Sequence, residues 1–501
     1  MRVLILLFLA TQFLMPTSIF SQQIDWSPER IGNVLKEDYL AGATKDFYVI
    51  GTMRILKESK YAIYDYDHKK IGSGQIDLKV RKQLAVIEDI IETPSGAFAI
   101  LEIKDRKNKT KDVYASKIVD GKLGEPEFLT TYLDKVKVTV LSFDAGVITD
   151  IEKERASRKQ SKDKTKYAII KSSNVNTWGA FGLEMAVFDQ DMKELWSRRF
   201  KPDFDLGDYV YEDFIVSNEG LVTILGKSDP TVIDFKVPND QVKVWRYGKD
   251  DTEEFELTID PKKSMKDAGL FESNSDEVIF GGTYFDKVKS SKIHGVFYST
   301  LNFNTGKSDS KTYEFDEAFL EKVGKNKWLT FASTGRSFSI KHLIYFADGS
   351  YSFIAERFSA NSNSAAGTVE RHKYTTGVIF LPHFSAEGDL INISILDKNF
   401  TSYIPDLCSY TVGVYDGKTA LVYNDLKTKK EQKELKKKKT VFTDITTFDN
   451  SGNLVSEKTL FTNKMGWFDY YIPSESTAVS GDMFLMHGLK GAYKVGHLKM
   501  D

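Results

Sequence analysis

The stretch from Glu88 to Lys104 reads EDIIETPSGAFAILEIK and contains two apolar runs on either side of the Ser95-Gly96 pair. The second run, Ala97–Lys104, is rich in aliphatic and aromatic residues, a composition typical of a strand. Glycine tolerates the positive φ that a tight hairpin requires. The stretch is therefore predicted to be a β-hairpin.

The same pattern recurs along the chain, so the sequence is predicted to consist of repeated units. A glycine turn such as Glu219-Gly220 precedes most of the apolar octets, and a second turn such as Asp120-Gly121 follows them. Each unit is therefore predicted to contain four strands, A to D. The octets, assigned to strand B, are Asp46–Met53, Ala97–Lys104, Val147–Glu154, Leu221–Ser228, Glu277–Tyr284, Tyr351–Phe358, Thr419–Leu426 and Met483–Lys490.

Eight such units have an average length of about 60 residues, which is within the range of propeller blades. The last unit ends after its third strand, and the segment Ile24–Leu35 would supply the missing outer strand and close the ring. The sequence therefore predicts one all-β domain, residues 22–501, folded as an eight-bladed β-propeller of four-stranded blades. A ring of seven blades is the second interpretation, and two stacked sandwiches are the third.

The first 21 residues are predicted to be a secretory signal peptide. Arg2 precedes the apolar stretch Val3–Ala10, and Ser21 is a small residue at the expected cleavage point. Thr11 and Pro16 interrupt the run, and a membrane anchor would need about 20 uninterrupted apolar residues. We therefore expect an exported protein without a transmembrane segment, located in the periplasm, at the outer surface or outside the cell.

The composition excludes several classes of protein. The chain has a single cysteine, Cys408, so a disulfide scaffold and a zinc site of paired cysteines are excluded. Its 69 basic and 71 acidic residues nearly cancel, and the net charge therefore predicts no nucleic-acid partner. The histidines lack metal-ligand spacing and no glycine-rich loop opens a helix, so no metal and no cofactor are predicted.

Four-stranded repeats behind a predicted signal peptide resemble secreted bacterial β-propeller proteins, and the resemblance covers essentially the whole mature chain. The resemblance is one of architecture, because the sequence has no Trp-Asp series, no sialidase-type box and one Gly281-Gly282 pair in place of a recurrent double glycine. Propellers include enzymes, binding proteins and scaffolds, so the resemblance implies a fold and no particular activity.

Acidic residues recur seven positions before the turn glycine. Asp89 and Asp213 occupy this position in two units, Asp38 is aligned with them in the first unit, and His342 occupies it in the sixth. We expect these four side chains to lie at one height near the mouth of the central channel. Convergent carboxylates could hold a hard cation or share a proton. The favoured interpretation is structural, since such residues commonly bond to neighbouring backbone.

The predicted connections between strands B and C carry an excess of basic residues. In a propeller all of these connections leave from one face, and their charges sum to +18. One face is therefore predicted to be cationic and the remainder of the molecule anionic. Taken singly, a charged run is usually a solvated loop. The basic residues predicted to bind a partner are Arg158, Lys159, Lys162, Lys436, Lys437, Lys438 and Lys439.

Aromatic residues are concentrated in the predicted connections between strand D and the next strand A. Trp328, Trp467 and Tyr471 are the candidate platforms, since flat rings beside polar groups stack on sugars or extended peptides. Most aromatic side chains of a propeller instead pack between blades.

Three functions are consistent with this sequence. The leading hypothesis is an exported, non-enzymatic propeller whose basic face binds an anionic polysaccharide, lipopolysaccharide or an acidic protein. The second is a hydrolase or lyase acting on glycans or peptides, with Asp38, Asp89, Asp213 or His342 as acid, base or ligand. The third is a passive scaffold of the cell envelope, which would expose a large apolar patch.

Overall fold

The structure is a computed structural model of the whole chain. It describes residues 24–32, 37–54, 58–80, 83–108, 110–133, 157–174, 181–200, 209–228, 242–257, 259–260, 263–274, 276–286, 293–317, 319, 336–363, 371–427, 440–464, 470–479, 481–489 and 491–500.

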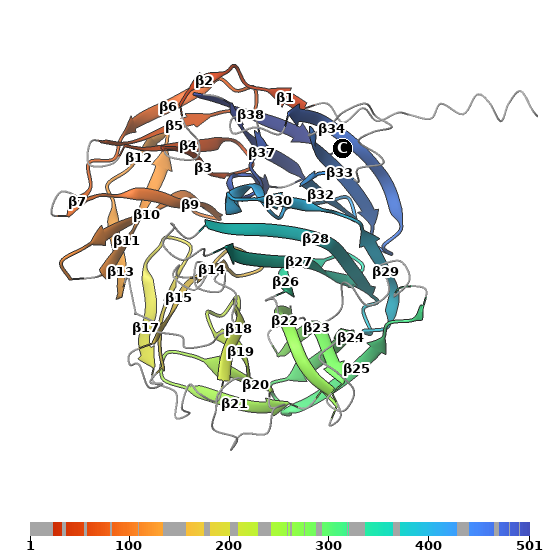
Figure 1. Cartoon of the computed structure of the whole chain (residues 1–501). Coiled ribbons are helices and arrows are strands. Elements are labelled where there is room, and N and C mark those ends of the chain that lie inside the picture. The colour runs from red at the N-terminus through yellow and green to blue at the C-terminus, as the bar shows by residue number, and fades with distance from the viewer. Residues whose placement is uncertain are drawn as a thin grey trace, which may run out of the picture.

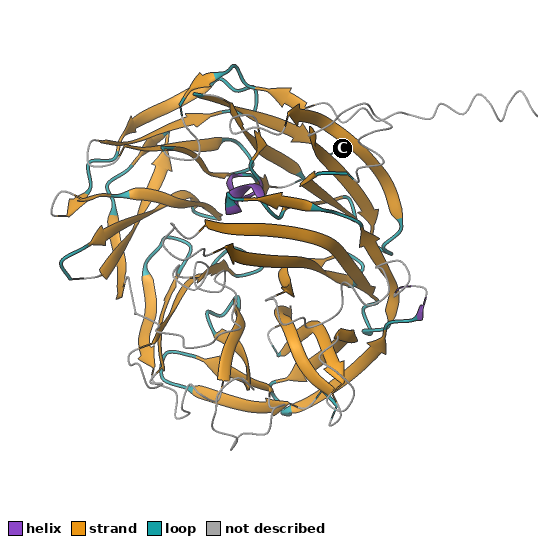
Figure 2. Ribbon diagram, in the orientation of Figure 1, coloured by secondary structure: helices purple, strands orange, loops and turns teal. Residues whose placement is uncertain are grey.

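Eight antiparallel sheets are arranged around a common centre, and nearly all of the described secondary structure is strand (Figures 1 and 2). Blade 1 consists of β3 (Asp38–Ala43), β4 (Tyr48–Arg54), β5 (Glu58–Tyr64) and β6 (Lys70–Gln75). Blade 2 consists of β9 (Val86–Thr93), β10 (Gly96–Asp105), β11 (Thr110–Val119), β12 (Lys122–Leu123) and β13 (Glu127–Leu133). Blade 3 consists of β14 (Ser157–Gln160), β15 (Tyr167–Asn174), β16 (Phe181–Phe188) and β17 (Glu194–Phe200). Blade 4 consists of β18 (Tyr209–Val216), β19 (Val222–Ser228), β20 (Val242–Tyr247) and β21 (Thr252–Leu257).

The second half of the chain continues in the same order. Blade 5 consists of β22 (Lys263–Asn274), β23 (Glu277–Asp286), β24 (Ile293–Asn302) and β25 (Lys307–Glu314). Blade 6 consists of β26 (Arg336–Tyr345), β27 (Tyr351–Asn363), β28 (Arg371–Phe384), β29 (Leu390–Leu396) and β30 (Phe400–Ser402). Blade 7 consists of β31 (Tyr410–Tyr415), β32 (Lys418–Asp425), β33 (Thr440–Asp449) and β34 (Leu454–Lys464). Short elements between blades are the strands β7 (Lys79–Val80) and β8 (Gln83–Leu84) and the 3-10 helices η1 (Pro405–Leu407) and η2 (Pro473–Glu475).

Blade 8 joins the two ends of the described chain. Its strands are β35 (Tyr470–Tyr471), β36 (Thr477–Val479), β37 (Asp482–Leu489), β38 (Ala492–Lys499), β1 (Ile24–Trp26) and β2 (Arg30–Ile31). Both β1 and β2 pair with β38, so the N-terminal segment forms the outer edge of the C-terminal sheet. The architecture is an eight-bladed β-propeller, as the repeats predicted, and the seven-bladed interpretation is wrong.

The apolar core lies between neighbouring blades. Phe98 and Ile100 of blade 2 pack with Ile169 and Phe188 of blade 3, and comparable clusters join the other blades. Because strand side chains alternate between two faces, each blade presents apolar residues to both neighbours. This explains the nearly continuous apolar octets of the sequence.

The chain order gives the disc two distinct faces. B–C connections and D–A connections leave from one face, which we call the loop face, and A–B and C–D turns lie on the opposite turn face. Most A–B turns follow the prediction, with Gly220 and Gly349 at φ +86°. In blade 3 the turn residue is Lys164, at φ 61°, and Ser161 orders this turn by accepting a hydrogen bond from the Lys166 amide at 2.9 Å.

The position of this turn shows that the predicted strands of blade 3 were assigned wrongly. The octet assigned to its strand B, Val147–Glu154, lies outside the described residues, and the second strand of the sheet is β15. The prediction was wrong because it relied on a glycine, whereas Lys164 holds the left-handed conformation at a cost of about 1 kcal/mol. Strand β14 is the inner strand, so Arg158 and Lys159 are strand residues, and Lys162 belongs to the turn face.

Candidate functional site

Strand β14 places two basic side chains between three blades. Successive residues of a strand point to opposite faces of the sheet. Arg158 accordingly contacts Glu102 of blade 2, and Lys159 contacts Asp213 of blade 4. One basic candidate of the sequence, Lys159, therefore binds one acidic candidate, Asp213.

The Arg158 guanidinium lies in a buried network with blade 2. Its Nη2 is 2.9 Å from Oε2 of Glu102, and its Nη1 is 3.8 Å from Oε2 of Glu88. Lys111 and the Tyr132 hydroxyl also bind the Glu102 carboxylate. Arg158 and Glu102 are 12% and 6% exposed at their side chains, so this charge pair is largely withdrawn from water. Its partners are internal, and Arg158 is not part of an exposed basic loop.

Asp89 lies next to this network on the inner strand of blade 2. Burial raises the pKa of the Asp89 carboxyl to about 6, although Arg158 and the Ile90 amide favour its charged form. The same burial raises the pKa of the nearby Tyr167 and Tyr132 hydroxyls, which disfavours either phenol as a base. The site therefore holds one carboxyl that titrates near neutral pH beside a permanent cation.

Asp213 has a structural role. Its Oδ1 accepts hydrogen bonds from Lys159 at 2.6 Å and from the Phe214 amide at 2.8 Å. Its Oδ2 accepts one from the Leu270 amide of blade 5 at 2.9 Å. A single carboxylate thus joins blades 3, 4 and 5, as the structural interpretation of the sequence predicted for such residues.

A β-bulge determines which acidic residues are equivalent. On five inner strands the register shifts past one residue, at Ala41, Glu88, Glu212, Lys266 and Lys341. The residues that follow the bulge in blades 2, 4, 5 and 6 are Asp89, Asp213, Asp267 and His342.

Two positions of the predicted alignment change with this register. In blade 1 the equivalent residue is Gly42, so Asp38 is out of register. Asp38 accepts a hydrogen bond from Thr52 at 2.7 Å and is 6% exposed. In blade 5 the equivalent residue is Asp267, whereas a count of seven positions back from the Ser275-Asp276 turn ends at Gly269, because β22 is longer than the other inner strands and contains a second register shift at Ser273. Asp267 was therefore missed.

The structure does not bring these side chains together as a ligand set. His342 packs against Tyr410 of blade 7, with ring centroids 5.4 Å apart. Within the described ranges, no group of three His, Cys, Asp or Glu side chains could hold a metal ion.

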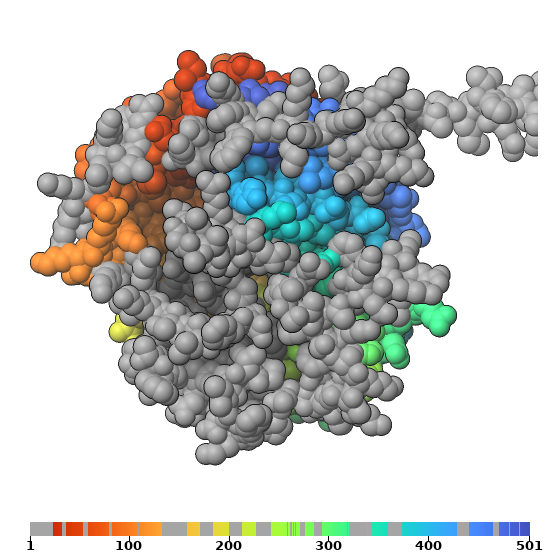
Figure 3. Space-filling view, in the orientation of Figure 1, coloured from red at the N-terminus to blue at the C-terminus, as the bar shows by residue number. Residues whose placement is uncertain are grey.

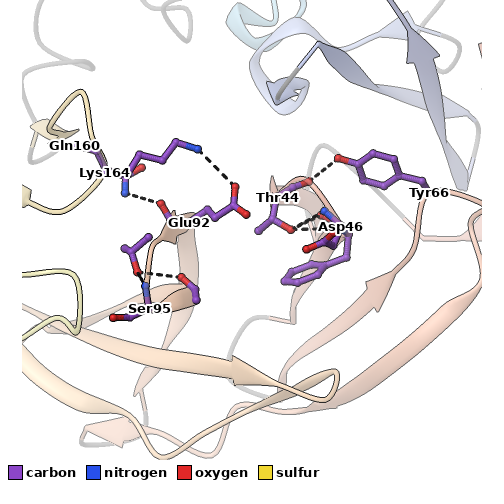
Figure 4. Close-up of polar contacts among 10 residues, drawn as sticks. Thr44, Asp46, Tyr66, Glu92, Ser95, Gln160 and Lys164 are labelled. Atoms are coloured by element: carbon purple, nitrogen blue, oxygen red, sulfur yellow. Dashed lines mark hydrogen bonds and ion pairs between the residues drawn. The ribbon is translucent and has the colours of Figure 1, made fainter.

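Lys162 and its neighbours lie on the turn face. Its Nζ lies 5.4 Å from the centroid of the Tyr345 ring of blade 6. Lys164 is 3.5 Å from the Glu92 carboxylate of blade 2, and Gln160 donates a hydrogen bond to the Glu92 carbonyl at 2.9 Å (Figure 4). Removing the misassigned segment Glu152–Lys166 lowers the charge sum of the B–C connections from +18 to +14.

The remaining binding candidates divide into one that the structure excludes and several that it does not describe. Tyr471 is fully buried and its hydroxyl hydrogen-bonds to that of Thr411, so it packs between blades 7 and 8 and is no platform. Trp328, Trp467, Lys436, Lys437, Lys438 and Lys439 lie outside the described residues.

Two described basic residues of the loop face are exposed to solvent. Arg106 and Lys107 lie at the tip of the β10–β11 hairpin. The hairpin is ordered by Asp105, whose Oδ1 accepts hydrogen bonds from the amides of Lys107 at 2.9 Å and Asn108 at 3.2 Å. The turn face has the opposite character, because exposed acidic residues outnumber basic ones in its described turns. Examples are Asp67, Asp120, Asp191, Glu219, Asp250, Asp251, Glu387 and Asp416.

Comparison with known proteins gives no family for this chain. No family model matches the chain, and no curated protein matches it. The WD40 domain of SCAP from fission yeast aligns at 10% identity and TM-score 0.39, over 95% of this chain and 96% of that one. The β-propeller domain of the Trilobed protease from Pyrococcus furiosus aligns at 10% identity and TM-score 0.39, over 85% and 98%. A polysaccharide lyase, PL25-Ulvanlyase, aligns at 9% identity and TM-score 0.38, over 81% and 90%.

These alignments give no activity for this chain. The protein is a β-propeller with eight four-stranded blades. In the described part of the chain, no helix has the length and apolar character needed to cross a membrane.

Proposed function

We propose that this protein is an exported, non-enzymatic propeller that binds an anionic polysaccharide with its loop face. The observation that carries the proposal is the position of the B–C connection of blade 7. Strand β32 ends at Asp425 and β33 begins at Thr440, both at the loop face. The intervening sequence Lys427–Lys439 contains eight lysines and two glutamates.

The described contacts at the base of this connection support the proposal. Lys427 lies 3.3 Å from Asp425 and 2.5 Å from Asp444, so its charge is already neutralised within blade 7. The lysines further along the sequence, together with Arg106 and Lys107 of blade 2, supply the excess positive charge. An acidic turn face would repel the same polymer, which favours a single orientation of binding.

The experiment measures binding of heparin, dextran sulfate and polygalacturonate, with neutral dextran as the reference, at 50 and 300 mM NaCl. We expect at least one anionic polymer to bind and the affinity to fall steeply at the higher salt concentration, because charges at the loop face are screened beyond about 8–10 Å. Binding of neutral dextran with equal affinity, or of no anionic polymer, would contradict the proposal. Binding only to lipopolysaccharide or to an acidic protein would reassign the partner.

A matched pair of variants tests whether the polymer binds to the loop face. Lys436–Lys439 are changed to glutamine in one variant, and four exposed lysines of the turn face are changed in the other. Both variants lose four charges, and we expect only the first to lose affinity, by tenfold or more. The turn-face lysines are Lys45, Lys69, Lys193 and Lys249.

A hydrolase or lyase activity is the second candidate function, and Asp89 is the observation that favours it. A carboxyl with a pKa of about 6 beside Arg158 has the acidity of a general acid. Incubation of the same polymers with the protein and with an Asp89→Asn variant tests it. Shortening of a polymer by the wild type and not by the variant would replace the binding proposal.

Export is tested separately. We expect the protein isolated from its producing cells to begin at Gln22, as determined by intact mass and N-terminal sequencing. A chain that retains Met1–Ser21 in the cell would contradict it.

A further inference from the structure

Residues 24–31, which we call the N-terminal strap, form the outer edge of blade 8. The strap contains β1 and β2, and both strands pair with β38, β1 through three residue pairs and β2 through two. Figures 1 and 3 show the red strap beside the blue C-terminal residues at the upper edge of the disc. Because so few residue pairs hold it, the strap can leave β38 while the blades stay folded.

A tryptophan anchors the strap to blades 7 and 8. The centroid of the Trp26 ring lies 5.5 Å from that of Phe461 on β34 and 5.6 Å from that of His487 on β37. Gly496 of β38 permits this packing, because a Cβ at that position would lie 2.8 Å from the Trp26 ring. The strap therefore packs closely on both blades.

His68 of blade 1 holds the strap from the other side. It lies in the turn between β5 and β6 and is 9% exposed. Its Nε2 is 2.9 Å from the Asp25 carbonyl oxygen, and its Nδ1 is 2.9 Å from the Tyr48 hydroxyl. Arg30 Nη2 donates to the same hydroxyl at 3.0 Å. One chain of hydrogen bonds thus begins and ends on the strap and passes through blade 1.

The direction of these hydrogen bonds requires a neutral His68 ring. A carbonyl oxygen only accepts, so Nε2 carries the ring proton. Burial raises the pKa of the Tyr48 hydroxyl to about 12, so this hydroxyl keeps its proton. Since Arg30 donates to the hydroxyl oxygen, the hydroxyl donates its own proton to Nδ1. Protonation of Nδ1 would set two donors against each other and place a second cation beside Arg30.

The groups around His68 also favour the neutral ring. Burial lowers the pKa of His68 below its ordinary value of 6.5, Arg30 and His497 lower it further, and the Asp25 carbonyl and carboxylate oppose them. His497 lies on β38 with its Nε2 3.1 Å from Asp482. The neighbouring titratable groups on the hairpin of His68 are Tyr64, Asp65, Tyr66, Asp67 and Lys69.

The lowered pKa determines how closure depends on pH. The released strap leaves His68 closer to its ordinary pKa, so the released state binds a proton more readily than the closed state. Closure is therefore most stable above pH 6.5, and it weakens as the pH falls below that value.

We propose that the N-terminal strap is a pH-sensitive closure of the propeller, which protonation of His68 releases from β38 in acid. Release leaves β38 as an unpaired outer edge of blade 8. The device lies at the rim of the disc and does not depend on the polymer proposed for the loop face.

Hydrogen exchange of the full chain, read by mass spectrometry, tests the release. The Ser27 amide donates to the Val495 carbonyl at 2.8 Å and the Val495 amide donates to the Ser27 hydroxyl at 3.0 Å, so both amides lose their acceptors when the strap leaves. Exchange rates at pH 7.5 and pH 5 are divided by the intrinsic rates at the same pH to give protection factors. Strand β19 of blade 4 is the internal reference.

We expect the protection of the Ser27 and Val495 amides to fall about tenfold from pH 7.5 to pH 5, relative to that of β19. The ordinary histidine pKa limits the effect of one ring to about 30-fold at pH 5. Protection that does not change with pH, or that falls equally in the strap and in β19, would overturn the proposal.

A matched pair of histidine variants identifies the trigger. His68→Gln keeps an amide donor for the Asp25 carbonyl and cannot titrate. His294→Gln makes the same change on β24 of blade 5. We expect the pH dependence of strap protection to disappear in His68→Gln and to persist in His294→Gln, with circular dichroism and thermal unfolding verifying that both variants fold. An equal pH dependence in both variants would overturn the proposal.

An exposed variant, Asp25→Asn, tests the same claim without altering the His68 ring. It removes a carboxylate that favours the charged ring and keeps the carbonyl that binds Nε2. We therefore expect strap protection in Asp25→Asn to fall more steeply in acid than in wild type. A fall that is equal or smaller would contradict the role of His68, including the case in which His68→Gln loses the strap at both pH values.

Discussion

Strand β14 and the β10–β11 hairpin carry the same kind of charge in opposite surroundings. In β14, Arg158 and Lys159 lie between blades, and each has a carboxylate partner. In the hairpin, Arg106 and Lys107 lie at the exposed tip. Charge at the first site stabilises the packing of blades, and charge at the second is available to a partner. A basic residue in the sequence is therefore informative only once its strand is known.

The largest expected effect of a substitution is at Arg158. Arg158→Met leaves Glu102 buried without its guanidinium partner and should lower the free energy of unfolding by about 3–5 kcal/mol. Arg106→Met, at the exposed tip, should change it by less than about 0.5 kcal/mol. Urea unfolding followed by tryptophan fluorescence measures both. Equal effects of the two substitutions would remove the distinction between the two regions.

A second large effect is expected at Asp213, which connects three blades. Asp213→Ala leaves the Phe214 and Leu270 amides without their acceptor and should cost about 2–3 kcal/mol of unfolding free energy. Asp191→Ala, at an exposed turn, is the control and should cost less than about 0.5 kcal/mol. The same urea unfolding experiment measures both variants. If Asp213→Ala lost as little unfolding free energy as Asp191→Ala, Asp213 would not join the blades.

The sequence predicted the architecture because each blade repeats the same local signals. Octets such as Ala97–Lys104 and turns such as Gly220 follow from strand composition and from the conformational freedom of glycine. Blade 3 was misassigned because Lys164 replaces the glycine and no local pattern reveals this.

The positions of the candidate site residues depend on strand register, which the sequence indicates less clearly than it indicates strands and turns. Asp89, Asp213 and His342 were aligned correctly, and Asp267 was missed because β22 is longer than the other inner strands and includes a second register shift at Ser273. The pairing of Arg158 with Glu102 joins residues 56 positions apart, and no local pattern encodes such a contact.

An effect that depends on pH is expected at Asp89. Its pKa is raised from 3.8 to about 6 in the folded protein, so the folded state binds this proton more tightly than the unfolded state. The contribution of Asp89 to the unfolding free energy therefore falls as pH rises from about 4 to about 6, by about 1.4 kcal/mol for each pKa unit.

Asp89→Asn removes this dependence, so its stability relative to wild type should increase across that range and stay constant above it. His383 contributes the opposite slope between pH 6.5 and about 4, because burial lowers its pKa to about 4. His383 is present in both proteins, so its contribution cancels when the unfolding free energy of wild type is subtracted from that of the variant. If this difference did not change with pH, Asp89 would not have the raised pKa.

The smallest effect on stability is expected at the hairpin tip, where the effect on binding is the relevant one. Changing Arg106 and Lys107 to glutamine should leave the unfolding free energy within about 0.5 kcal/mol of wild type. The same change should weaken binding of the anionic polymer and flatten its salt dependence, because two exposed charges of the loop face are lost. Unchanged binding would show that this hairpin is not part of the binding surface.

Lysine acetylation, read by mass spectrometry with and without a bound anionic polymer, tests directly which face of the propeller binds. We predict that the polymer protects Lys107 and the lysines between Lys429 and Lys439, and that Lys69, Lys193 and Lys249 react at unchanged rates. Protection of the turn-face lysines instead, or equal protection of both faces, would contradict it.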